Sequence, residues 1–67
     1  MKDFNLSRSE IIYLIDEWIF SARNREILKR RLLDGMTYEE IAEEFHLSTQ
    51  SVKAIVYKNK ETILSHI

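Results

Sequence analysis

The sequence predicts an all-α protein, a single four-helix domain that spans residues 1–67. The composition is the first observation: there is no proline and only one glycine, while leucine, isoleucine, glutamate, lysine and arginine dominate, as in helices rather than in sheets with tight turns. The second observation is that apolar residues recur at helical spacing in several runs. The third is that a serine or threonine able to cap a helix precedes each run. A chain of this length has room for one small core.

The first helix is expected over about residues 8–20. Ser7 and Glu10 form a capping-box pattern, in which each side chain accepts a hydrogen bond from a backbone N–H group at the helix start. One face of this helix is apolar, and Asp16 and Glu17 lie opposite. The apolar positions are Ile11, Ile12, Leu14, Ile15, Trp18 and Ile19. In a domain this small we expect most of that face to be core, and the alternative is a homodimer contact through this helix.

The second helix is expected over about residues 22–33, between a serine cap and Asp34-Gly35, because glycine readily takes the left-handed conformation that ends a helix. Its buried face consists of Ile27, Leu28 and Leu32. Arg31 projects from that face, so it covers apolar surface with its stem, pairs with an acid or reaches a phosphate. Of these options we expect an ion pair, with Glu40 or Glu44.

Residues 37–62 are expected to form a helix-turn-helix. A second capping box starts a short helix at Thr37, and Ser48 caps a long fourth helix that begins at Thr49. The connection of only three residues between them makes the two helices cross steeply. The residues expected to pack this unit are Ile41, Ala42, Phe45, Leu47, Val52, Ile55 and Val56, and Tyr38 lies on the same side of the short helix. His46 occupies the turn, where we expect a left-handed backbone that histidine tolerates better than most residues.

Three segments resemble the fourth conserved region of bacterial sigma factors. They are Arg25-Glu26-Ile27-Leu28, Leu32-Leu33-Asp34-Gly35-Met36-Thr37-Tyr38-Glu39-Glu40-Ile41-Ala42-Glu43-Glu44 and Leu47-Ser48-Thr49-Gln50-Ser51-Val52-Lys53, within about two-thirds of the chain. The resemblance implies a four-helix domain whose last helix enters the major groove of a promoter element and which also contacts RNA polymerase. His46 departs from the glycine that the family prefers at the turn. A sigma factor also needs a region that melts promoter DNA, so we expect a stand-alone sigma-like protein or a fragment of a longer one.

If the fourth helix lies in the major groove, the side opposite its apolar face meets DNA. The expected base-edge contacts are Gln50, Lys53, Ala54 and Tyr57. Gln50 can pair with adenine, Lys53 with guanine and Ala54 with a thymine methyl group. The expected backbone contacts are Thr49, Ser51 and Lys58, with Arg23 and Arg25 of the second helix as a further group. The alternative is that these side chains are only an exposed polar face.

The net charge of −1 does not by itself indicate a nucleic-acid ligand. Residues 20–33 hold five basic residues and one acid, residues 34–48 hold five acids and no base, and residues 49–67 hold three lysines and one glutamate. Any DNA contact must therefore come from the two basic blocks. The acidic stretch between them is expected to be a solvated face, and a basic protein partner is the alternative.

No catalytic or cofactor motif accompanies this pattern. There is no cysteine, no glycine-rich phosphate loop and no metal-ligand spacing around either histidine, so we expect no enzyme, metal site, cofactor or small-molecule substrate. No apolar run reaches the roughly 20 residues of a membrane span, and the lack of cysteine favours the reducing cytoplasm. The main hypothesis is sequence-specific binding of double-stranded DNA in transcription. The alternatives are a module that docks on RNA polymerase or a regulator, and a phage DNA-packaging or recombination accessory protein.

Overall fold

Each helix begins at a capping side chain. The computed structural model describes residues 6–67, and that range holds four helices and no strand: α1 (Arg8–Trp18), α2 (Ala22–Leu32), α3 (Tyr38–Phe45) and α4 (Thr49–Leu64). The all-α prediction is thereby confirmed. Ser7 and Thr37 take part in full capping boxes, and Ser21 and Ser48 each accept a hydrogen bond from the third backbone N–H of their helix.

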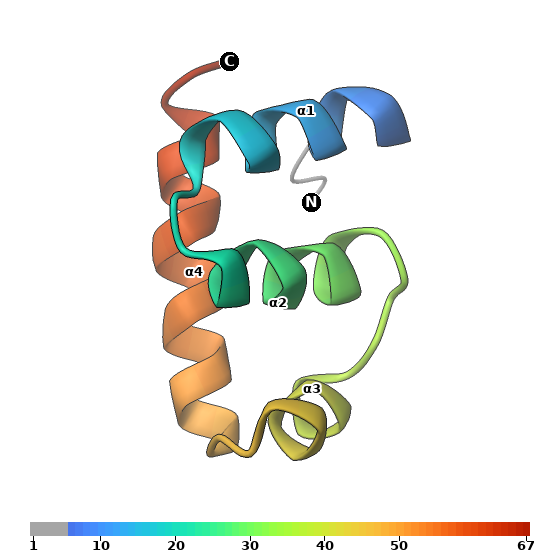
Figure 1. The fold of residues 1–67 in the computed structure, drawn as a ribbon, viewed down its shortest axis with the longest axis vertical. Coiled ribbons are helices and arrows are strands. Elements are labelled where there is room, and N and C mark those ends of the chain that lie inside the picture. The colour runs from blue at the N-terminus through green and yellow to red at the C-terminus, as the bar shows by residue number, and fades with distance from the viewer. Residues whose placement is uncertain (1–5) are drawn as a thin grey trace.

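The longest helix, α4, is the spine of the molecule, and the other three helices pack along it (Figure 1). α3 crosses it at its N-terminal end, α2 packs beside its middle and α1 lies near its C-terminal end. The first turns of α4 therefore belong to the unit formed with α3, whereas its last turns belong to the contact with α1.

One apolar core joins all four helices. Its buried side chains are Ile15, Ile19, Ile27, Leu28, Ile41, Ala42, Val52, Val56 and Ile63. Burial of each large aliphatic side chain stabilises the fold by about 1.5–3 kcal/mol relative to its exposed state. The apolar face predicted for the first helix supplies Ile15 and Ile19 to this core, and Ile11 and Leu14 pack against it.

The helix ends differ slightly from the predicted ones. α1 ends at Trp18 rather than near residue 20, because Ile19 takes an extended backbone (φ −106°, ψ 111°) and its side chain is 2% exposed. α2 ends at Leu32 rather than near residue 33. α4 continues past residue 62 to Leu64, which brings Ile63 into the core.

Arg31 does not form the ion pair predicted with Glu40 or Glu44. Its Nη1 atom donates to the carbonyl oxygen of Met36 at 2.9 Å, and its guanidinium carbon lies 4.3 Å from the centre of the Tyr38 ring. A half-buried backbone carbonyl needs a donor, and the arginine supplies it. The prediction was wrong because the position on a helix gives the direction of a side chain but not its partner in the next segment.

His46 provides the left-handed residue of the turn between α3 and α4, with φ 57° and ψ 45°. The N–H group of Leu47 donates to the carbonyl of Ala42 at 2.9 Å, a bond spanning six residues that closes helix ends of the Schellman type. The turn thus forms without a glycine, at a backbone cost of about 1–2 kcal/mol.

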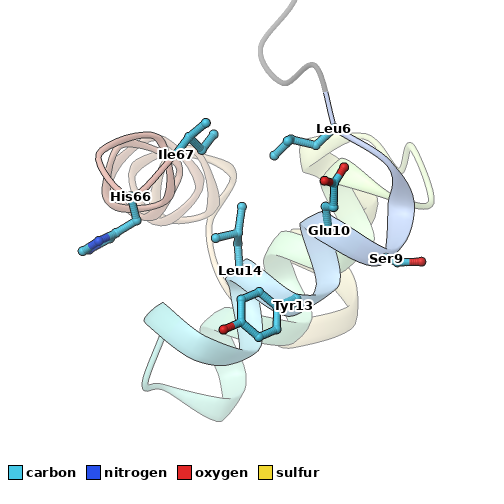
Figure 2. A pocket seen from close by; sticks show the side chains of 7 residues that line it. All are labelled: Leu6, Ser9, Glu10, Tyr13, Leu14, His66 and Ile67. Atoms are coloured by element: carbon cyan, nitrogen blue, oxygen red, sulfur yellow. The ribbon is translucent and has the colours of Figure 1, made fainter.

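At the far end of α4 the chain closes on α1. The ring of His66 stacks on that of Trp18, with centroids 3.7 Å apart and planes 3° from parallel. An open, mostly apolar groove lies near this contact, where Leu6 and Leu14 face the space between α1 and the end of α4 (Figure 2). Tyr13, which also lines the groove, is 62% exposed, so the outer face of α1 retains apolar surface.

Candidate nucleic-acid interface

The unit formed by α3 and α4 is closed by side chains from both helices. Ile41, Ala42, Val52 and Val56 are buried, and Phe45, Leu47 and Ile55 are half-buried against the core. The small side chain of Ala42 allows the two helices to approach closely at the turn. As a result, one side of α4 is fixed against α2 and α3 and its opposite side is turned outward.

The outward side of α4 carries the residues expected to touch base edges. Gln50, Lys53, Ala54 and Tyr57 are all exposed, and their spacing places them on one face over two turns of helix. Tyr57 is 57% exposed although it is a large aromatic residue. This face presents an amide, an ammonium group, a methyl group and a phenol, which are chemical groups able to contact base edges.

The start of α4 presents hydroxyl groups beside that face. Ser48 accepts a hydrogen bond from the N–H of Ser51 at 3.0 Å and donates its own proton to the Ser51 hydroxyl oxygen at 2.8 Å. The Ser51 proton is therefore available for an outside acceptor such as a phosphate oxygen. Thr49 is half-buried and Lys58 is exposed.

A cluster of charged and aromatic side chains surrounds Tyr38, the first residue of α3. The Arg31 guanidinium lies 4.3 Å from the centre of its ring and the Lys53 ammonium 5.7 Å from it. The Tyr57 ring meets it edge-on, at 6.2 Å between centroids and 86° between planes. Hydrogen bonding to Tyr38 also raises the pKa of the Tyr57 hydroxyl above its ordinary value.

Sequence reasoning assigned Tyr38 only to the packed side of its helix and missed this cluster. The one available signal was the i, i+4 spacing of Lys53 and Tyr57, which puts them side by side on a helix. That spacing does not reveal which residue of another helix they meet.

The two arginines at the start of α2 have different surroundings. Arg25 is half-buried, and its Nη1 donates to the carbonyl of Ile19 at 2.8 Å, beyond the end of α1. Arg23 is exposed and donates to the neighbouring Asn24 side chain at 3.2 Å. Arg25 is therefore a structural link between α1 and α2, and Arg23 is the more accessible of the two for a phosphate.

Most of the remaining basic charge of α2 is neutralised within the fold. Lys29 pairs with Asp16 at 3.0 Å, and Arg30 pairs with Glu44 at 2.9 Å and with Glu26 at 3.0 Å. The hydrogen bonds from Arg30 lower the pKa of the Glu44 carboxyl. The positive charge that reaches the outer face of α4 therefore comes chiefly from the lysines of α4 itself.

The described range shows neither a metal cluster nor a membrane-spanning element. Within residues 6–67 no group of three or more histidine, cysteine, aspartate or glutamate side chains could hold a metal ion. In the same range no helix is both long and apolar enough to cross a membrane.

Comparison with known families agrees with this geometry. The family model described as Sigma-70, region 4 matches residues 21–61, from the cap of α2 to near the end of α4, and includes every residue of the interface described above. The match confirms the resemblance seen in the sequence. Searches of curated proteins and of solved structures returned no match. The matched family consists of DNA-binding domains rather than enzymes.

Proposed function

Since this chain belongs to the sigma-70 region 4 family, we propose that it binds double-stranded DNA in a sequence-specific manner during transcription, with α4 in the major groove. The observation that carries the proposal is the division of α4 into two sides. Val52 and Val56 are buried in the core on one side, while the other side presents an unbroken exposed face from Gln50 to Tyr57.

Base reading is assigned to four side chains on that face. Gln50 pairs with adenine through its amide, which donates and accepts at once, and Lys53 donates to the acceptors of guanine. Ala54 contacts a thymine methyl group, and Tyr57 reaches a base edge or the wall of the groove. A good bidentate contact, such as that of Gln50 with adenine, discriminates between bases by about 1–3 kcal/mol.

Backbone contacts orient the helix and set the dependence on salt. Thr49, Ser51 and Lys58 serve the phosphates next to α4, and Arg23 serves those next to α2. Arg25 is left out of this set because it holds the Ile19 carbonyl. Only cationic contacts release counterions from DNA, so two or three of them give a slope of about −2 to −3 for the logarithm of the affinity against the logarithm of the salt concentration. Because the net charge is −1, binding by a single copy is expected to be weak at physiological salt, and RNA polymerase or a second copy joined through α1 would add affinity.

A second candidate is a module that docks on RNA polymerase or a regulator, with DNA secondary. It is favoured by the outer side of α3, where Glu39 and Glu43 are exposed while Glu44 is held by Arg30. A basic protein surface would complement this side. Family membership favours transcription over DNA packaging or recombination as the process.

The test is selection from a library of 20-base-pair duplexes with randomised centres, followed by fluorescence anisotropy over a salt series. The expected result is one enriched sequence that binds more tightly than a random duplex, and a loss of preference at single positions in Gln50→Ala and Lys53→Ala. Arg8→Gln removes one positive charge from the start of α1, outside the interface, and serves as the control for Lys53→Ala. Glutamine keeps a donor for the Leu33 carbonyl, to which Arg8 donates at 3.1 Å.

Two results would count against the proposal. If no duplex binds at low salt, DNA is not the ligand and the docking candidate takes its place. If the library yields binding without enrichment, and the variants weaken all duplexes equally, the protein grips the backbone and does not read bases.

A further inference from the structure

The guanidinium group of Arg31 is held by two partners, a backbone carbonyl and an aromatic ring. Arg31 leaves the apolar side of α2, is half-buried, and holds the Met36 carbonyl at 2.9 Å while its guanidinium carbon lies 4.3 Å from the centre of the Tyr38 ring. Guanidinium groups stack on aromatic rings because they are planar and weakly hydrated. Arg31 therefore fixes the orientation of Tyr38 from behind, from a helix that does not itself read DNA in the proposed arrangement.

The Tyr38 ring in turn contacts two side chains of the proposed reading face, which consists of Gln50, Lys53, Ala54 and Tyr57. The Lys53 ammonium lies 5.7 Å from its centroid, within the range of a cation–π contact. The Tyr57 ring meets it edge-on at 6.2 Å, a favoured arrangement of aromatic pairs. Lys53 and Tyr57 thus both contact the Tyr38 ring, and Arg31 stacks on the same ring.

We propose that Arg31 and Tyr38 are positioning residues that set the orientation of Lys53 and Tyr57 before DNA arrives. The inference rests on the proposed function and adds the source of its selectivity. A long side chain that must be ordered only on binding weakens the complex by roughly twofold to tenfold. A lysine already held against an aromatic ring loses less freedom on binding, so less affinity is lost. This gain applies only to the base pair that the held lysine can reach.

Gln50 is a proposed base-reading residue of α4 that lies outside the Tyr38 cluster, so its base preference serves as an internal control. It lies on the exposed face one turn before Lys53, and the contacts that surround Tyr38 are made by Arg31, Lys53 and Tyr57. Disturbing the Tyr38 cluster should therefore alter the reading of some base pairs and leave the one read by Gln50 unchanged.

The experiment uses the full chain and the same randomised duplex library. Lys53→Ala, Tyr57→Ala and Gln50→Ala first identify which positions of the enriched sequence depend on each side chain. Arg31→Lys keeps the charge but loses the planar stacking group, and Tyr38→Leu removes the ring. Both are expected to reduce the preference at the Lys53 and Tyr57 positions by roughly fivefold or more, the lower end of one base contact. The Gln50 position should keep its preference, and Tyr38→Phe, which retains the ring but loses the hydroxyl that meets Tyr57, should behave like the unaltered chain at the Lys53 and Gln50 positions.

The salt dependence separates positioning from direct grip. If Arg31 only positions other groups, Arg31→Met leaves the slope of log affinity against log salt unchanged, whereas loss of a phosphate contact reduces its magnitude by about 1. A reduced slope with unchanged base preferences would overturn the inference. So would an equal loss at all positions in the Arg31 and Tyr38 variants that remain folded by circular dichroism.

Failure of the proposed function looks different. In that case the unaltered chain itself enriches no sequence, and the inference falls with it. If the unaltered chain selects a sequence and Tyr38→Leu selects the same one with the same preferences, only the inference is wrong. Should Arg31→Lys fail to fold, the comparison between Tyr38→Phe and Tyr38→Leu decides alone.

Discussion

Arg30 grips the carboxylate of Glu44 with two nitrogens: its Nη2 lies 2.9 Å from Oε2, and its Nε lies 3.2 Å from both oxygens. This fork joins α2 to α3 across the outside of the helix-turn-helix. Bidentate pairs of this kind are more specific in geometry than a single contact, although much of the Coulomb energy of exposed pairs is lost to solvent screening.

The pair is expected to make stability depend on pH. Arg30 lowers the pKa of Glu44 below the ordinary value of 4.5, so the stabilisation is fully present above about pH 4.5 and is lost as the pH falls through the lowered pKa. Urea denaturation between pH 2 and 7 should therefore show a flatter acid limb for Glu44→Gln than for the unaltered chain. Glu43→Gln, an exposed neighbour, is the control, and an identical loss of acid dependence in both variants would disprove the role of the pair.

His46→Gly is expected to stabilise the protein by about 1 kcal/mol. The φ of 57° at this position is costly for any residue with a Cβ and costs glycine little, and the exposed imidazole gives up little packing. The measurement is the free energy of unfolding from urea titration. A loss of stability would mean that the imidazole makes a contribution larger than the backbone strain.

The second left-handed position should respond in the opposite direction. Gly35 has φ 70°, and a Cβ built there meets nothing within 4 Å, so the strain of Gly35→Ala is confined to the backbone. A destabilisation of about 1–2 kcal/mol is expected. Together the two variants test whether the sign of the effect follows the backbone conformation alone.

Two alanines of the helix-turn-helix should differ sharply when enlarged. Ala42 is 5% exposed where α3 meets the core, so Ala42→Leu overpacks it and costs about 1–3 kcal/mol. Ala54 is exposed on α4, so Ala54→Leu should change stability by less than about 0.5 kcal/mol while weakening binding to the selected duplex. Thermal unfolding measures the stability of each variant, and fluorescence anisotropy with one DNA probe measures its affinity. Unimpaired DNA binding by Ala54→Leu would remove Ala54 from the reading face.

His66→Ala should change the emission of Trp18, the only tryptophan of the chain. The imidazole covers one face of the indole at 3.7 Å, so its removal exposes the ring to water and shifts the emission to longer wavelength. His46→Gly, which alters a histidine at the other end of α4, should leave the spectrum unchanged. Equal spectra for all three proteins would show that the stack does not persist in solution.

Local chemistry made much of the fold predictable. The capping boxes at Ser7 and Thr37, the serine cap at Ser48 and the three-residue turn are encoded within a few neighbouring residues, and they fixed where helices begin. Helix ends were less certain: Ile19 leaves α1 because its side chain is drawn into the core, and that attraction depends on the other helices.

The candidate site was predictable only in part. The exposure of Gln50, Lys53, Ala54 and Tyr57 follows from the helical period once the buried side of α4 is known. The cluster around Tyr38 joins three helices, and no spacing within one segment reveals such a meeting. For the same reason sequence reasoning assigned the acid of α3 to Arg31, whereas the structure pairs Glu44 with Arg30.

The N-terminal half of α4 carries the proposed DNA-binding face. At the other end of α4, Ile63 and the His66 stack hold α1, so one helix serves both ligand binding and the stability of the fold. A ligand bound to the exposed face of α4 would stabilise the whole folded chain. The melting temperature of the protein would then rise with the logarithm of the ligand concentration once that concentration exceeds Kd. Conversely, a substitution near Trp18 that leaves an appreciable fraction of the chain unfolded would weaken ligand binding by that fraction, although it lies at the opposite end of α4 from the proposed interface.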